Sequence, residues 1–375
     1  MMNQPVVCSK IERYKDRHKT KQKDLKTRNS IPKQFKHDTF LTVTDQQTDQ
    51  ANAMNNPILD SFIGVQHSLN QLIIGQPALV ERLLITLISD GHLLVEGPPG
   101  LAKTRAIKTL AHFIQGDFQR IQFTPDLLPA DLTGTEIYQA NQSEFAFKAG
   151  PLFHNIILAD EVNRASAKVQ SALLEAMGER QITIGQTTHP LPDLFMVMAT
   201  QNPIEQEGTF PLPEAQLDRF LLHVTVDYPG VKDELAILRL TQQEAAAPEL
   251  SESPVQLTEE TIATAKQQAL EVHMSESVEQ YIVQLIHATR RPELFNEALS
   301  NWIEFGASPR GTLALNRTAR AHAWLKGQDY VTPEDVQAVA HDVLRHRLIL
   351  SYEAQAEGIT ADSFIDRLLT NVAFA

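Results

Sequence analysis

The hydrophobic positions along the chain change their spacing near residue 230. Before that point, short runs that are fully apolar or alternate apolar with polar residues predict β-strands, and segments with helical spacing separate them. The five predicted strands are residues 92–95, 118–123, 155–159, 194–200 and 221–226. After residue 230 the patterned segments have helical spacing. This change predicts an α/β domain over residues 54–230 and an α-helical domain over residues 231–375.

Apolar spacing and capping residues locate the helices. The predicted helices are residues 58–74, 80–88, 106–114, 169–177, 275–289, 308–326 and 332–350, and the predicted β-hairpins are residues 135–148 and 181–190. We expect Gly178 to end the helix before it, and Ser308 to cap a helix that has proline at its first position. Thr332, followed by Pro333 and two acidic residues, predicts the start of the last of these helices.

Composition limits the kind of protein. A length of 375 residues is enough for two or three domains, and the only cysteine, Cys8, excludes a disulfide framework and a cysteine metal cluster. No stretch approaches ~18 consecutive apolar residues, so no transmembrane helix is expected. The N-terminus also lacks an apolar signal core. We therefore expect a cytoplasmic protein without membrane insertion.

The net charge of −13 is unevenly distributed. Residues 1–40 contain 11 Lys and Arg against 4 Asp and Glu, and the remainder is strongly acidic. The polar, aperiodic residues 1–53 are interpreted as a basic, disordered extension that is dispensable, with a nucleic-acid or membrane tether as the alternative. The acidic body argues against a duplex-binding surface, and 6% aromatic residues provide no stacking platform for single strands.

The segment from Glu96 to Thr104 reads EGPPGLAKT and joins the strand at 92–95 to a helix. In such a turn, backbone N–H groups at the helix N-terminus converge on a phosphate. The spacing matches G-x-x-x-x-G-K-[ST], except that Ala102 occupies the second glycine position. Lys103 would reach the β- and γ-phosphates, and the Thr104 hydroxyl would bind Mg²⁺. The alternative is a strand–turn–helix with an incidental lysine.

Polar residues also follow two later strands. Asp160 and Glu161 end the apolar strand at 155–159, and Asn202 follows the strand at 194–200. The ends of parallel strands open on a ligand crevice, where Asp160 would hold Mg²⁺ and Glu161 would polarise the attacking water. Asn202 would bond the γ-phosphate or the water. The alternatives are acids that open the next helix and an asparagine that serves as a turn residue before proline.

Five motifs stand in one order: GPPGLAKT, ILADE, ATQNP, LPEAQLDRF and GASPRG. With them the chain resembles an AAA+ ATPase, and more closely the MoxR family, over roughly residues 57–360. Residues 122–129 and 330–336 also look like MoxR proteins. The resemblance implies an α/β P-loop AAA+ core, with a five-stranded parallel sheet flanked by helices, followed by an α-helical lid. Ala102 agrees with the family, which has alanine at this position.

The resemblance also implies a role for single residues. Asp160 and Glu161 would form the Walker B pair, and Asn202 would be sensor 1. Arg310 would be sensor 2. Arg219 would be an arginine finger inserted into the neighbouring subunit's site, and Arg164 would face the same interface. The alternative for Arg219 is a surface salt bridge with Asp218 or Glu214. The residues expected to bind ATP are Gly75, Gln76, Gly97, Pro98, Pro99, Gly100, Leu101, Ala102, Lys103, Thr104 and Arg105.

The function implied is that of an ATP-hydrolysing chaperone that remodels or activates protein partner complexes. The resemblance implies a homo-oligomer, a hexameric ring, with both hairpins facing the pore and a von Willebrand factor A domain protein as partner. One alternative is an AAA+ nucleic-acid motor, which the acidic body disfavours. Another is an ATP-binding switch with negligible turnover, which the presence of Glu161 and Arg219 disfavours.

Overall fold

In the computed structural model, residues 56–140, 143–203, 208–246 and 256–374 are described. The chain divides into two units, residues 1–54 and 55–375. The predicted extension over residues 1–53 lies outside the described residues. Among the helices of the described ranges, none is long and apolar enough to cross a membrane.

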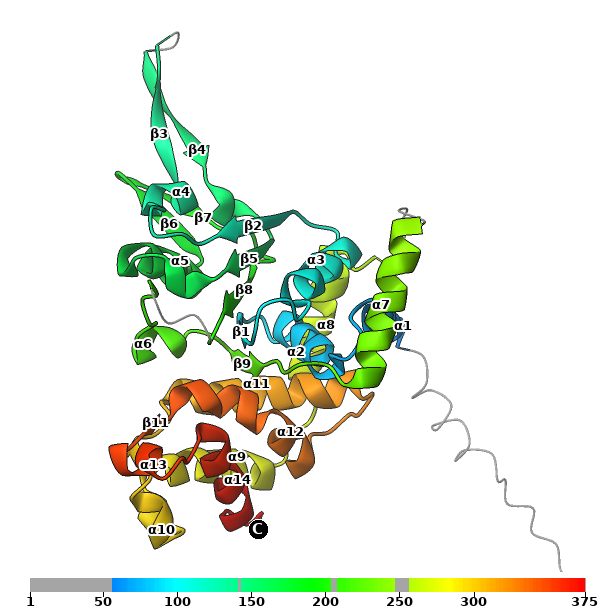
Figure 1. Ribbon diagram of the computed structural model, residues 1–375, viewed down its shortest axis with the longest axis vertical. Coiled ribbons are helices and arrows are strands. Elements are labelled where there is room, and N and C mark those ends of the chain that lie inside the picture. The colour runs from blue at the N-terminus through cyan, green and yellow to red at the C-terminus, as the bar shows by residue number, and fades with distance from the viewer. Residues whose placement is uncertain (1–55, 141–142, 204–207, 247–255, 375) are drawn as a thin grey trace, which may run out of the picture. The chain divides into compact units, whose positions relative to one another are not determined.

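A five-stranded sheet forms the centre of the α/β part (Figure 1). The strands are β1 (Leu93–Glu96), β2 (Phe118–Gln122), β5 (Ile156–Asp160), β8 (Met196–Gln201) and β9 (Leu222–Thr225). They lie in the order β2–β5–β8–β1–β9, and every pairing is parallel. The predicted parallel sheet is confirmed. Since all strands run the same way, the carboxyl ends of β1, β5 and β8 meet at one edge.

Both faces of the sheet are covered by helices. Alternate residues of a strand point to opposite faces, so in β5 Ile156 and Leu158 join one apolar core while Ile157 and Ala159 join the other. The first core includes α1 (Pro57–Leu72), α2 (Pro77–Ile88) and α3 (Lys103–Phe113), and the second includes α4 (Pro129–Thr133) and α5 (Ala167–Glu179). Short turns complete this part: η2 (Pro151–Phe153), η3 (Val162–Arg164) and α6 (Glu214–Leu217). β5 and β8 therefore read as apolar runs because they are buried on both sides, whereas the edge strand β2 alternates and keeps Arg120 and Gln122 exposed.

Two antiparallel hairpins extend from this part of the chain (Figure 1). One is β3 (Gly134–Gln139) with β4 (Glu144–Ala149), and the other is β6 (Gln181–Ile184) with β7 (Thr187–Pro190). The rings of Phe147 and His189 stack with centroids 4.1 Å apart, which joins the two hairpins. Both predicted hairpins are confirmed.

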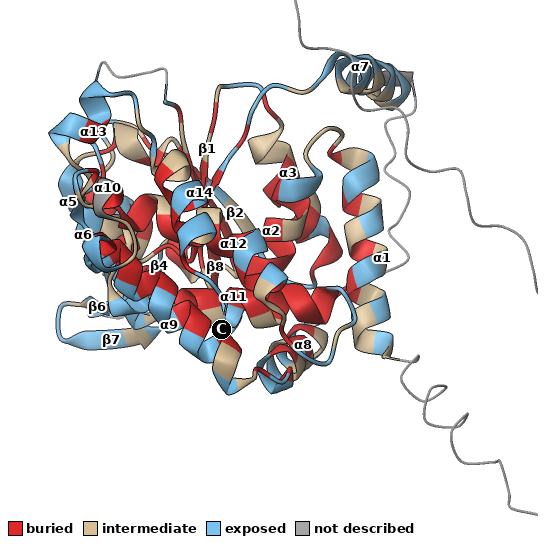
Figure 2. Ribbon diagram, turned by 90° about the horizontal axis from the view of Figure 1, so that it is seen from below, coloured by how far each residue is buried: buried red, intermediate tan, exposed pale blue. Residues whose placement is uncertain are grey.

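The C-terminal part is mainly helical. Its elements are α7 (Val231–Ala246), α8 (Glu259–Glu271), α9 (Glu276–Arg290), η4 (Pro292–Leu294), α10 (Glu297–Ser300), β10 (Ile303–Phe305), α11 (Pro309–Leu325), α12 (Pro333–Leu344), η5 (Arg345–Arg347), β11 (Ile349–Leu350), α13 (Tyr352–Ala356) and α14 (Ala361–Asn371). Figure 2 shows α11 mostly buried, as is α2, while much of α1 is exposed. The boundary at residue 230 stays a prediction, because residues 55–375 form one compact unit.

Three local predictions were wrong. Gly178 does not end a helix but lies inside the last turn of α5. The helix expected to reach Leu350 ends at Leu344, where a 3₁₀ turn follows and β11 then pairs with β10. The helical domain therefore contains a short antiparallel strand pair, which its apolar spacing did not indicate. The predicted caps are confirmed, because the Ser308 hydroxyl accepts from the Arg310 N–H and Thr332 forms a capping box with Asp335.

Candidate active site

The loop between β1 and α3, predicted to bind phosphate, has backbone conformations that favour small residues. A Cβ on Gly97 would lie 2.5 Å from the Val226 carbonyl oxygen, so only glycine fits where the loop leaves the sheet. Gly100 has φ +84°, and a Cβ there would meet nothing within 4 Å. Ala102 caps α3 with φ 57°, in the left-handed region that glycine occupies more easily. Ala102 therefore has the left-handed backbone conformation that glycine, the usual residue at this position of the motif, adopts more easily.

Lys103 is the first residue of α3 and turns back over this loop. Its Nζ donates to the carbonyl oxygen of Gly97 and, at 3.1 Å, to that of Gln201 at the end of β8. Neighbouring carbonyl oxygens thus hold the ammonium group at the carboxyl edge of the sheet. Thr104 follows in the first turn of α3.

Asp160 stands at the end of β5, nine-tenths buried, and both its oxygens are occupied. Oδ1 accepts from the Thr200 hydroxyl at 2.6 Å, and Oδ2 accepts from Nε and Nη2 of Arg120 at 3.1 and 2.7 Å. The Thr200 hydroxyl in turn accepts from the Glu161 N–H at 2.9 Å. This network fixes the orientation of Asp160 and of the backbone that carries Glu161.

Glu161 has φ 56°, a left-handed conformation that costs a non-glycine residue of order 1–3 kcal/mol. The strained backbone places its carboxylate beside β2 and η3. Oε2 accepts from Nε2 of Gln122 at 2.8 Å and from Nη1 of Arg164 at 3.1 Å. The predicted base is therefore close to Asp160 and restrained by two donors. Asn202 lies directly after β8, buried, next to the Gln201 carbonyl that Lys103 contacts.

Gly75 and Gln76 lie between α1 and α2, against the chain that leads into α7. Nε2 of Gln76 donates to the Asp227 carbonyl oxygen at 2.9 Å. A cavity of ≈70 Å³ lies here, lined by mostly apolar residues that include Ile74, Gln76, Gly100, Ala102, Ile237 and Leu240. Gly75 and Gln76, predicted to bind ATP, thus lie beside the phosphate loop. The Arg105 guanidinium, predicted to bind nucleotide, belongs to a residue that lines this cavity, and it forms an ion pair with Glu244 of α7.

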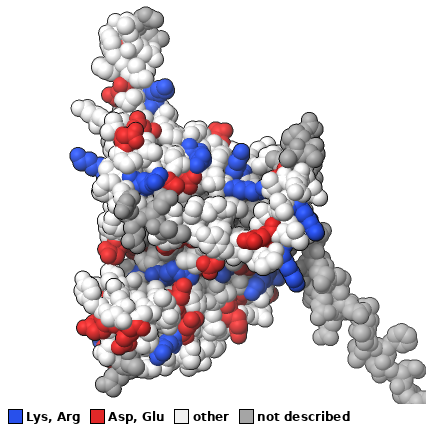
Figure 3. Space-filling model, in the orientation of Figure 1, with Lys and Arg blue, Asp and Glu red and all other residues white. Residues whose placement is uncertain are grey.

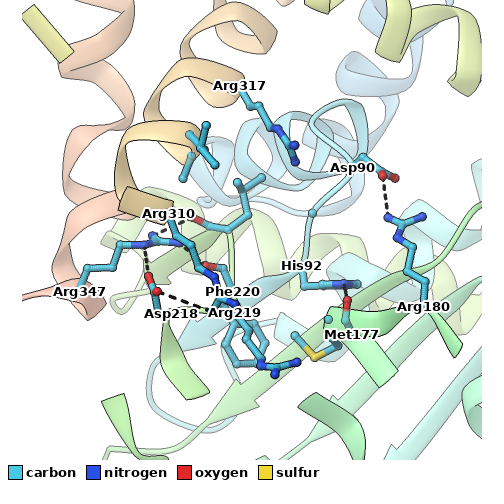
Figure 4. Close-up of a pocket in the computed structure, with 15 residues that line it drawn as sticks. Asp90, His92, Met177, Arg180, Asp218, Arg219, Phe220, Arg310, Arg317 and Arg347 are labelled. Atoms are coloured by element: carbon cyan, nitrogen blue, oxygen red, sulfur yellow. Dashed lines mark hydrogen bonds and ion pairs between the residues drawn. The ribbon is translucent and has the colours of Figure 1, made fainter. Parts of the chain in front are cut away.

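Arg219 and Arg310 lie together in a different place, a pocket between α5 and α11 (Figure 4). Nη1 of Arg219 donates to the Leu174 carbonyl oxygen at 2.7 Å. Arg310 lies 3.7 Å from Asp218, whose carboxylate also accepts from Ser308 and Arg347. Neither arginine lines the cavity beside the phosphate loop. The structure thus brings Lys103, Asp160, Glu161 and Asn202 to one edge, and Arg219 with Arg310 to another site.

Sequence reasoning missed Arg120, Gln122 and Thr200. All three contact the paired carboxylates, because β2 and β8 flank β5 in the sheet. Their only signal in the sequence is a position on or next to predicted strands. Within the described ranges, no group of three or more His, Cys, Asp or Glu residues is placed to hold a metal ion. A Mg²⁺ ion here would therefore depend on Thr104, Asp160 and phosphate oxygens, a donor set of the kind that Mg²⁺ accepts.

This sheet order, the phosphate loop and the paired carboxylates define the class of phosphate-loop proteins to which AAA ATPases belong. Two family models agree with that class. The model of the ATPase family associated with various cellular activities (AAA) matches residues 92–222, and that of the AAA lid domain matches residues 297–368.

Whole-chain relatives narrow the class to one family. The chain is 47% identical to "Chaperone MoxR1" of Mycobacterium tuberculosis over 307 residues, which cover 81% of this chain and 80% of the relative. It is 32% identical to "Protein MoxR" of Paracoccus denitrificans over 80% of this chain and 92% of that one. A crystal structure of a protein from Cytophaga hutchinsonii aligns with a TM-score of 0.79 and 44% identity, covering 88% of this chain and 98% of that one. The chain belongs to the MoxR family of AAA+ ATPases.

Proposed function

We propose that this chain hydrolyses ATP with Mg²⁺ in a hexameric ring and uses the energy to remodel or activate protein partner complexes. The observation that carries the proposal is the convergence of the phosphate loop with the two carboxylates. Lys103 contacts the end of β8, and Thr200 on that strand contacts Asp160. Family membership supports the same activity.

The residues of the loop would act on the phosphates. The backbone N–H groups of residues 100–104 would bind the β-phosphate, while Lys103 exchanges its carbonyl partners for β- and γ-phosphate oxygens. Thr104 and Asp160 would hold Mg²⁺, which would neutralise charge on the phosphates. Because Arg120 already pairs with Asp160, its side chain would move aside when the cation binds.

Glu161 would polarise the attacking water, with Asn202 bonding the water or the γ-phosphate. Gln122 and Arg164 both donate to Oε2 of Glu161, so a movement of either donor would change the orientation of the carboxylate. Arg164 lies on η3, at the surface where we propose that a neighbouring copy binds. In this proposal, assembly of the ring adjusts the position of the base.

Arg219 would supply the arginine finger to the adjoining subunit, and Arg310 the sensor 2 contact. Their pocket is separate from the phosphate-loop cavity of the same chain, which supports action on a neighbour's nucleotide. A finger of this kind is worth ~10³–10⁵ in rate. The similarity to the relative named as a chaperone, MoxR1, supports a chaperone role for this chain.

The β3–β4 hairpin would contact the protein client. Tyr138 and Phe145 are 54% and 68% exposed, and their rings pack together at 5.3 Å. Figure 3 shows most of the described atoms of this hairpin's outer part without charge, whereas acidic and basic side chains are interspersed over the rest of that face. Exposed aromatic residues of this kind bind apolar protein segments. We also propose that the partner is a von Willebrand factor A domain protein and that this protein is cytoplasmic.

The test compares nucleotide binding with turnover. Lys103→Ala should lose ATP binding, whereas Glu161→Gln should bind ATP and lose ~10²–10⁴ in turnover, because the base acts only in the chemical step. Arg219→Ala should also bind ATP and hydrolyse it very slowly. Mixed rings of Lys103→Ala and Arg219→Ala subunits should regain turnover wherever an intact finger faces an intact site.

Two results would contradict the proposal. Near-normal turnover by Glu161→Gln would remove the assignment of the base. Absence of rescue, in mixed rings shown to have exchanged subunits, would exclude action of Arg219 on a neighbour. A pull-down with Glu161→Gln held in the ATP state, compared with Lys103→Ala, should retain the client and partner only in the former.

A further inference from the structure

The pocket between α5 and α11 has a volume of ≈310 Å³ and an excess of positive charge (Figure 4). Its charged residues are the arginines 180, 219, 310, 317 and 347 and the aspartates 90 and 218. His92 adds no charge at pH 7, because burial lowers the pKa of its imidazole to about 4. Five guanidinium groups against two carboxylates leave an excess of three positive charges.

The two carboxylates already have close cationic partners. Asp218 accepts from the buried Arg347 at 2.9 Å, and Asp90 pairs with Arg180 at 2.7 Å and with Lys266. The excess therefore falls on Arg219, Arg310 and Arg317. Of these, Arg219 donates to a carbonyl oxygen, and Arg310 is 3.7 Å from an Asp218 carboxylate that two other groups share. The chain itself leaves these three charges poorly compensated.

Arg317 was not singled out by any motif. It lies seven residues after Arg310 on α11, so the two side chains leave the helix on the same face. Figure 4 shows it projecting from α11 toward the space between Arg310 and Arg180. Within the described part of the chain, its side chain makes no hydrogen bond or ion pair, and it is exposed. Leu313, on the turn between the two arginines, is 60% exposed at the same pocket, as expected of a surface that another copy covers.

We propose that this pocket receives the phosphate groups of ATP bound to a neighbouring copy of the chain, and that Arg317 contacts those phosphates beside Arg219 and Arg310. The inference rests on the proposed ring and adds to it a third guanidinium group. Planar guanidinium groups pair with phosphate oxygens through two parallel hydrogen bonds. The pocket lies at the small end of the ~300–1,000 Å³ range of ligand sites, which suits a charged head group rather than a whole nucleotide. The base and ribose stay with the neighbour's phosphate loop.

The experiment uses full-length Arg317→Ala, Arg317→Lys and, as a matched control, Arg291→Ala. Arg291 is exposed and lies outside the pocket, and within the described ranges its side chain makes no hydrogen bond or ion pair. We expect Arg317→Ala to bind ATP within about threefold of the wild type and to lose at least tenfold in turnover. Lysine should restore part of the loss because the charge remains, and Arg291→Ala should behave as the wild type.

Subunit mixing and assembly measurements separate a phosphate contact from a protein contact. Lys103→Ala subunits keep the arginines of the pocket between α5 and α11, so adding them should raise turnover per Arg317→Ala subunit. In the Glu161→Gln background, sedimentation should show that Arg317→Ala weakens rings with ATP more than rings without nucleotide. Equal weakening in both states would assign Arg317 to a protein–protein contact and overturn the inference. Wild-type turnover by Arg317→Ala, or no rise on mixing, would also overturn it.

These outcomes are distinct from failure of the proposed function. If the wild type does not hydrolyse ATP, or if Lys103→Ala keeps normal turnover, the proposed ATPase is wrong. If Arg219→Ala abolishes turnover and Arg317→Ala does not change it, only the role of Arg317 is wrong.

Discussion

Gly178 lies in the last turn of α5, directly against the side chain of Arg219. A Cβ at this position would lie 2.0 Å from Nη1 of Arg219. Glycine is otherwise unfavourable inside a helix by roughly 0.5–1 kcal/mol relative to alanine. Gly178 therefore makes the helix less stable than alanine would, but it leaves the space in which the Arg219 guanidinium lies. The prediction that Gly178 ends the helix did not indicate this role.

Gly178→Ala should separate stability from activity. The new methyl group displaces the flexible end of Arg219, while the helix gains alanine's higher propensity, so the melting temperature should stay level or rise slightly. Turnover should fall toward that of Arg219→Ala, with ATP binding unchanged. Thermal melts and steady-state ATP hydrolysis measure the two effects, and normal turnover in a folded Gly178→Ala protein would show that this position of Arg219 is not needed.

At the scale of elements, residues at the start of α11 make hydrogen bonds to the segment that carries Arg219, in the pocket between α5 and α11. The Ser308 hydroxyl accepts from the Arg310 N–H at 3.1 Å and donates to Asp218 at 2.8 Å. Arg347, from η5, donates to Asp218 and to the Phe220 carbonyl oxygen. The segment that carries Arg219 is therefore positioned by contacts from the helical part as well as from α5.

Ser308→Ala should cost about 1 kcal/mol of stability through the lost cap and should also lower turnover. The matched control is Thr360→Ala, because Thr360 caps α14 through the Ser363 N–H at 3.1 Å and lies outside the pocket. Urea unfolding should show similar losses for both variants. If the two also have equal turnover, the cap of α11 does not position the pocket.

At the scale of the whole folded unit, buried histidines couple stability to pH. His92 accepts at Nδ1 from the Val197 N–H at 3.1 Å and lies 3.2 Å through Nε2 from the Met177 carbonyl oxygen, so its neutral form satisfies both partners. Burial, and secondarily the charge of Arg180, lowers its pKa to about 4. Burial and the charge of Arg347 likewise lower the pKa of His346 well below 6.5.

These shifts predict a loss of stability as the pH falls. The unfolded chain takes up protons on these histidines near pH 6.5, and the folded chain does not until a lower pH, so the free energy of unfolding decreases between about pH 6.5 and 4. The slope approaches about 1.4 kcal/mol per pH unit for each histidine. Burial raises the pKa of Asp90, but the hydrogen bond and charge of Lys266, with Arg180, outweigh it and lower that pKa. The hydrogen bond from His223 lowers the pKa of Glu96, so both carboxylates lose their contribution only at still lower pH.

Urea titrations at pH 7, 6 and 5 measure this slope. His112→Gln, which removes an exposed imidazole, is the control and should keep it. A free energy of unfolding that is constant between pH 7 and 5 would contradict the prediction.

The sequence by itself determined the features that depend on neighbours along the chain. Apolar or alternating runs predicted the five strands, because the central strands are buried on both faces and the edge strand β2 is only partly buried. The caps of α11 and α12 followed from local hydrogen bonding. The phosphate loop and the carboxylates after β5 are likewise local patterns. These features predicted the family, and the relatives confirm it. The roles of the site residues stay predictions.

Only the tertiary structure decided which of these residues meet. Arg120 reaches Asp160 because β2 pairs with β5, and Gly178 matters because α5 packs against the segment that carries Arg219. Arg317 and Arg219 line one pocket although they are almost a hundred residues apart in the sequence. Such contacts depend on strand order and helix packing, which are set by the burial of apolar surface across the whole fold and leave no periodic signal beside the residues themselves.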